Sequence, residues 1–142
     1  MEKLNPHTAG LMSARFGHDN LIALATTDGT RPAVRSVNAY YESGSFYVIT
    51  NAGSNKMLQL RENPAAAICG DWFTANGIGE NLGWIGEERN AELADRLRTA
   101  FSEWYGNGHN DEADRNTVIL RIRLTDGVLF HHGERYGIDF TE

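Results

Sequence analysis

The chain has little cysteine, no long apolar run and no excess of basic residues. Its one cysteine among 142 residues, Cys69, excludes a disulfide framework and indicates a reducing compartment. Because Cys69 ends the apolar run 65–69, we expect it to be a buried small hydrophobe rather than a reactive thiol. No stretch reaches the roughly 18 consecutive apolar residues of a membrane span, and residues 1–6 lack the apolar part of a signal peptide. We therefore expect a soluble, cytoplasmic protein without a membrane partner.

The charge balance is acidic, with 13 Lys and Arg against 19 Asp and Glu and a formal net charge of -6. Neither a nucleic-acid backbone nor an anionic lipid surface attracts such a protein, so we expect no nucleic-acid partner. A phosphate ligand would need a local basic pocket. A hydrophobic content of 41% is typical of a globular protein, and 142 residues suffice for one domain, 1–142, without a disulfide or metal.

Short apolar or alternating runs in the first half predict β-strands. They lie at 21–27, 33–41, 45–50 and 65–70. Asp28-Gly29 is typical of a hairpin turn, so the first three strands should form a meander. In the second strand, the residues at 35, 37, 39 and 41 share one face, and the polar residues at 36, 38 and 40 share the other. One face is thus polar where a core would be apolar.

The second half is harder to interpret. We expect a helix over Glu87–Tyr105, whereas glycines leave 77–85 ambiguous. After a polar loop at 107–116, the alternation over 117–124 predicts a strand, and Asp126-Gly127 predicts a second hairpin into 128–131. Weaker patterns predict helices at 6–17 and 54–61. Many antiparallel strands with few helices indicate a mostly β fold, a small barrel with peripheral helices.

The stretch Thr50–Lys56 joins a predicted strand to a predicted helix and carries the features of an anion site. The first N–H groups of a helix lack partners and lie at the positive end of its dipole. Ser54 suits the N-cap position, and Lys56 in the first turn is unusual, because a cation there is disfavoured by roughly 0.3–1 kcal/mol. A bound anion would reverse that effect. An ordinary capped turn with a solvated lysine is the alternative reading.

Three motifs together resemble the pyridoxamine 5′-phosphate oxidase-like superfamily of FMN-binding split barrels. They are Gly29-Thr30-Arg31-Pro32-Ala33-Val34-Arg35-Ser36-Val37, Phe46-Tyr47-Val48-Ile49-Thr50-Asn51-Ala52-Gly53-Ser54-Asn55-Lys56 and Gln59-Leu60-Arg61-Glu62-Asn63-Pro64-Ala65-Ala66-Ala67-Ile68. The resemblance is to the short general-stress and nitroimidazole-resistance-type members. It implies a six-stranded antiparallel split β-barrel, usually a homodimer, with FMN in a groove between the subunits.

The resemblance also implies an oxidoreductase that acts on a small organic substrate by flavin-mediated hydride or electron transfer. It implies cofactor contacts from Arg35, Ser36, Val37, Asn38, Ile49, Thr50, Ser54, Asn55 and Lys56. Because the flavin performs the chemistry, no catalytic side chain is named, and no metal site is predicted. Two alternatives stay open: a non-catalytic stress protein that binds flavin, haem or deazaflavin, and a dimeric scaffold without a ligand.

Departures from the oxidase pattern argue against oxidation of vitamin B6. Tyr40 and Asn55 stand where a lysine and an arginine are expected, and the C-terminal segment with its Trp and Arg-rich contacts is missing. The pair His131-His132 should point to opposite faces of a strand, so we expect no shared metal unless the strand is broken there. Trp72-Phe73 is the aromatic pair to consider for a substrate pocket.

Overall fold

The computed structural model describes residues 1–106 and 111–142 and is mostly β. Its strands are β1 (Glu2–Lys3), β2 (Asn20–Thr27), β3 (Pro32–Glu42), β4 (Ser45–Asn51), β5 (Ala65–Gly70), β6 (Phe73–Trp84), β7 (Thr117–His131) and β8 (Glu134–Asp139). Its helices are α1 (Pro6–Phe16), α2 (Asn55–Glu62), the 3-10 turn η1 (Glu88–Asn90) and α3 (Ala91–Ala100). In the described part, no helix is both long and apolar enough to cross a bilayer.

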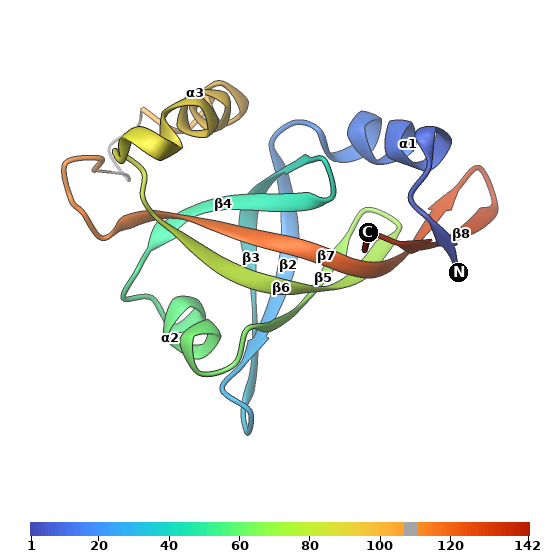
Figure 1. Cartoon of the computed structure of the whole chain (residues 1–142), viewed down its shortest axis with the longest axis horizontal. Coiled ribbons are helices and arrows are strands. Elements are labelled where there is room, and N and C mark those ends of the chain that lie inside the picture. Colours follow the sequence, from blue (N-terminus) through green and yellow to red (C-terminus); the bar gives the residue numbers. More distant parts are fainter. Residues whose placement is uncertain (107–110) are drawn as a thin grey trace.

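Six strands close into an antiparallel barrel in the order β7-β4-β3-β2-β5-β6, with β6 pairing back to β7. This arrangement confirms the predicted fold class, and β2, β3 and β4 form the predicted meander. β8 extends the sheet beyond β7, and β1 pairs with it in parallel. Figure 1 shows α1 and β8 toward one end of the barrel, with α2 and α3 toward the other.

Two apolar clusters hold the fold together. The larger fills the barrel around Phe46, whose ring packs within 5.5 Å of Phe16 and 5.4 Å of Tyr41, centroid to centroid. The smaller lies under α3, where Leu97 and Phe101 are fully buried against the outside of the barrel. Because α3 covers only part of the outer surface, the outward-facing residues of β2, β3 and β5 stay accessible.

The barrel is split between β3 and β4. These strands pair only at Tyr40, Tyr41 and Glu42 of β3, after which β4 continues along β7 and β3 along β2. Residues 32–39 of β3 therefore have a neighbouring strand on one side only, and we call their other side the open edge of β3. Unpaired backbone N–H and C=O groups along such an edge are available to a ligand.

The second predicted hairpin is wrong. β7 runs without a break through Asp126-Gly127, with a register shift beside Thr125 in its pairing to β6, and the chain turns only at His132-Gly133. Gly127 serves a close approach instead of a turn, because a Cβ there would lie 3.0 Å from the Phe73 ring and 3.0 Å from a backbone oxygen. The motif that predicted a turn thus marks a close approach of β7 to the neighbouring strand β6.

Three other expectations change in detail. The predicted long helix is the short turn η1 followed by α3, which ends at Ala100, and residues 107–110 of the predicted polar loop lie outside the described part. The ambiguous segment 77–85 belongs largely to β6. Cys69 is exposed rather than buried, because Ala66 and Ile68 take the inward positions of β5 and strand alternation turns Cys69 outward.

Candidate functional site

Arg35 reaches from β3 across the mouth of the barrel toward β2. Its guanidinium donates to the Thr26 hydroxyl at 2.7 Å and to the Leu24 carbonyl at 3.2 Å. Thr26 in turn donates to the Gln59 side chain of α2 at 2.5 Å. These bonds orient the guanidinium without neutralising it, since every partner is uncharged.

Lys56 approaches from α2. Its ammonium donates to the Thr50 hydroxyl at 2.8 Å and lies 3.4 Å from the Ser54 hydroxyl. Ser54 occupies the predicted N-cap position, but its hydroxyl donates to the Asn51 carbonyl at 2.8 Å and makes no capping bond. The first turn of α2 therefore lacks a side-chain cap, and its dipole adds positive potential beside Lys56.

The pKa values of both cations are lowered. Burial, the larger cause, and then the charge of Arg35 lower the pKa of Lys56, while burial lowers the pKa of Arg35. No described carboxylate forms a salt bridge with either group, although Arg96, Arg98, Arg121 and Arg123 each have one. Two partly buried cations without a counter-charge among the described residues are an arrangement that suits an anion.

Asn38 lies on the outer face of β3, where the cover of α3 ends. Its amide nitrogen donates to Asp19 at 3.0 Å, and the other Asp19 oxygen accepts from the Trp104 indole at 2.9 Å. Arg35 belongs to the opposite face of β3. Three residues of strand span about 10 Å, so a ligand that touches both side chains must cross the open edge of β3.

Of the other predicted cofactor contacts, some lie near Lys56 or on β3 and some do not. Thr50 and Ser54 lie beside Lys56, and Val37 faces inward, into the core, and pairs with Ile22 of β2. Ser36 is exposed on the outer face of β3. Two side chains point elsewhere: Ile49 packs into the cluster under α3, and Asn55 lines a surface hollow with Asp28 and Arg31.

Three residues that shape the site were missed at the sequence level. Thr26 and Gln59 position Arg35, and Asp19 positions Asn38. Thr26 left a usable signal, because it is a polar residue at an inward-facing position after Ile22 and Leu24. Asp19 left none, since its contact depends on how the α1–β2 connection lies against β3.

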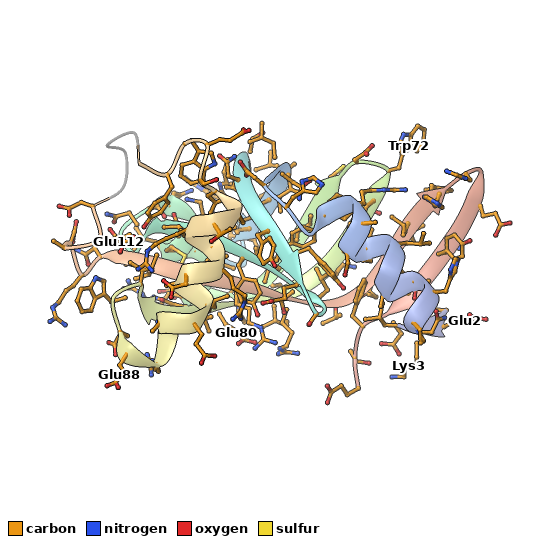
Figure 2. The ribbon with its side chains drawn as sticks, turned by 90° about the horizontal axis from the view of Figure 1, so that it is seen from above. Glu2, Lys3, Trp72, Glu80, Glu88 and Glu112 are labelled. Carbon is orange, nitrogen blue, oxygen red and sulfur yellow. The ribbon has the colours of Figure 1, made fainter. Side chains whose placement is uncertain are left out.

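A second group of side chains lies at the far end of the barrel. Trp72, with 72% of its surface exposed, and Phe130 line a hollow of about 470 Å³ together with Arg15 and the histidine pair. Figure 2 shows Trp72 projecting from this end, well away from Glu112 and Glu88 beside α3. Phe73, by contrast, is buried in the core.

The expectation that the two histidines point to opposite faces is wrong. β7 ends at His131, and His132 takes a left-handed backbone conformation with φ 49°. The rings stack with centroids 4.1 Å apart, and Arg15 donates to His131 Nδ1 at 2.9 Å. Within residues 1–106 and 111–142, no three His, Cys, Asp or Glu side chains are grouped as a metal site.

Removing the charge of Lys56 should stabilise the ligand-free protein. We expect Lys56→Met to raise its melting temperature by about 1–3 °C, because a half-buried cation in the first turn of a helix is disfavoured by roughly 0.3–1 kcal/mol. Scanning calorimetry without flavin measures this change. Lys3, which is exposed and paired with Asp139 at 2.9 Å, is the matched control, and Lys3→Met should give no gain. A lower melting temperature for Lys56→Met would show that the position of this cation in the helix is not unfavourable.

A protein-family comparison places the chain. The model described as pyridoxamine 5′-phosphate oxidase matches residues 11–129, so the chain belongs to the pyridoxamine 5′-phosphate oxidase family. This confirms the resemblance stated from the three motifs.

Solved structures share the fold at low sequence identity. General stress protein 26 from Bacillus anthracis is 16% identical, with a TM-score of 0.66 over 92% of this chain and 98% of its own. An FAD-binding protein from Mesorhizobium loti is 16% identical, with a TM-score of 0.61 over 87% and 92%. The haem storage protein HutZ from Vibrio cholerae is 15% identical, with a TM-score of 0.62 over 86% and 90%. These similarities establish the split-barrel fold.

Proposed function

We propose that this protein is an FMN-binding flavoprotein and an oxidoreductase for a small organic substrate. The observation that carries the proposal is the pair Arg35 and Lys56. Neither cation has a salt bridge to a described residue, Lys56 lies in the uncapped first turn of α2, and Arg35 is linked to α2 through Thr26 and Gln59. A phosphate dianion satisfies both charges and the unpaired helix amides at once.

Different residues of the chain contact the phosphate and the ring of such a cofactor. Arg35 and Lys56 bind the phosphate, with hydroxyls from Thr50 and Ser54 in reach of Lys56. The open edge of β3 and the side chain of Asn38 orient the ring. When bound, the flavin supplies hydride or electron transfer at its ring. The protein then needs to bind, orient and shield, and no side-chain acid or base is assigned.

We further propose that the protein is a homodimer, with the cofactor between the two subunits. The outer faces of β2, β3 and β5 carry small or apolar residues that line a shallow hollow of about 370 Å³, namely Ala23, Ala25, Val34, Ala67 and Cys69. These five positions carry no charge, which is typical of the centre of an interface, and Asp126 lines the same hollow from β7. A second copy on this face would add a wall beside Asn38 and Ser36. We also propose a cytoplasmic location, on the basis of the single thiol.

The colour of the purified protein tests the cofactor assignment. We expect a yellow protein, or a colourless one that quenches added FMN fluorescence with a dissociation constant in the micromolar range or below. Rapid mixing with NADH or NADPH then separates two functions, because an oxidoreductase reduces its bound flavin faster than free FMN is reduced. A colourless protein that does not bind FMN at micromolar concentration contradicts the proposal.

A binder without turnover is the second candidate. The observation that favours it is the hollow at the far end of the barrel, where stacked imidazoles, Trp72 and Arg15 offer contacts to a flat aromatic ligand such as haem. A flavin that binds but is not reduced faster than free FMN, together with a Soret band on addition of haemin, would favour this candidate.

A further inference from the structure

Asp19 fixes which end of the Asn38 amide is offered to a ligand. A carboxylate only accepts hydrogen bonds, so the group of Asn38 that faces Asp19 at 3.0 Å must be its NH2. The other Asp19 oxygen is held by the Trp104 indole at 2.9 Å, which keeps the carboxylate in place. The usual ambiguity of an asparagine amide is therefore resolved by chemistry at this position.

The amide oxygen of Asn38 is left free for a partner. This oxygen accepts no hydrogen bond from a described residue. Among the described residues, every buried side-chain polar atom has a hydrogen-bond partner. The Asn38 oxygen is therefore not buried and is accessible to solvent. Ser36, two residues away on the same face of β3, is exposed. The outer face beside the open edge thus presents an acceptor whose direction is set by Asp19.

We propose that Asn38, positioned by Asp19, recognises the N3–H group of the flavin ring. This inference rests on the proposed function. An oxidised flavin ring has one N–H donor, at N3, and its other polar ring atoms accept hydrogen bonds. A fixed acceptor can therefore pair with one ring atom only, and it selects ligands with an N–H at that position. Asp19 is a positioning residue, since it acts through Asn38.

Replacing Asp19 by asparagine should reverse this preference. In Asp19→Asn the Trp104 indole still needs an acceptor, so the new amide turns its oxygen to Trp104 and its NH2 to Asn38. Asn38 must then turn its oxygen inward and present its own NH2 to the ligand. A donor beside N3–H leaves both groups unpaired, which is penalised far more than the loss of one bond.

N3-methyl-FMN is the probe that tests the inference, because it lacks only the N3 hydrogen. We expect the unmodified protein to bind FMN at least about tenfold more tightly than N3-methyl-FMN, and Asp19→Asn to narrow this ratio below about threefold. The double variant Asp19→Asn/Asn38→Asp restores an outward acceptor and should recover most of the ratio. Fluorescence titration measures all three ratios without relying on turnover.

The outcomes separate this inference from the proposed function. If Asp19→Asn weakens FMN and N3-methyl-FMN by the same factor, Asp19 only supports the fold and the inference is wrong, although the FMN assignment stands. If the double variant behaves as Asp19→Asn does, the amide direction is not the cause. If the unmodified protein binds neither flavin, the proposed function fails first and this inference falls with it.

Discussion

The double variant Arg35→Ala/Lys56→Ala is expected to bind FMN at least about 100-fold more weakly while its affinity for riboflavin changes less than about threefold. Each hydrogen bond between a cationic side chain and a phosphate contributes roughly 1.5–3 kcal/mol, and two of them are lost. Riboflavin lacks the phosphate and never makes these bonds. Fluorescence titration with both flavins, on the same preparations, gives the two ratios.

The control variant loses the same amount of positive charge at positions outside the proposed phosphate site. Lys3→Ala/Arg61→Ala also removes two positive charges, from an exposed lysine and from the last turn of α2, and should leave the FMN affinity within about threefold. Thermal melting of the main variant checks that its fold is kept, because Arg35 also donates a hydrogen bond to Thr26. Equal weakening of FMN and riboflavin in the main variant would show that Arg35 and Lys56 do not hold the phosphate.

Local sequence patterns predicted those parts of the fold that depend on neighbours along the chain. Asp28-Gly29 correctly predicted the β2–β3 hairpin, since it follows one strand directly and the next strand begins three residues later. Asp126-Gly127 carries the same dipeptide and forms no turn, because its glycine is required by Phe73 on another strand. A dipeptide does not show whether its glycine serves the backbone turn or a distant neighbour.

The candidate site was likewise only partly predictable from the sequence. Lys56 stood out in the sequence as a cation in the first turn of a helix, and Arg35 was indicated by the resemblance to the family. The position of Arg35 relative to α2 needed the fold, because it depends on the contacts from Arg35 to Thr26 and from Thr26 to Gln59. The prediction for Cys69 was wrong because the residue lies in an apolar run whose alternation the sequence alone did not assign to a face.

A charged, long side chain on the outer face of β2 should separate the subunits and lower flavin affinity together. Ala23 pairs across the sheet with Ser36 and Cys69, so it lies at the middle of the proposed contact. Ala23→Arg should halve the mass in light scattering and weaken FMN by at least about tenfold, because a charge buried at an interface without a partner is penalised by several kcal/mol.

Glu88→Gln is the matched control, since it changes the net charge by the same +1 at an exposed position on η1. It should leave both the mass and the FMN affinity unchanged. A dimeric Ala23→Arg with full FMN affinity would show that the cofactor is not held against this face. A wild-type monomer that binds FMN would exclude the homodimer and leave the phosphate site intact, because Arg35, Thr50 and Lys56 all belong to one chain.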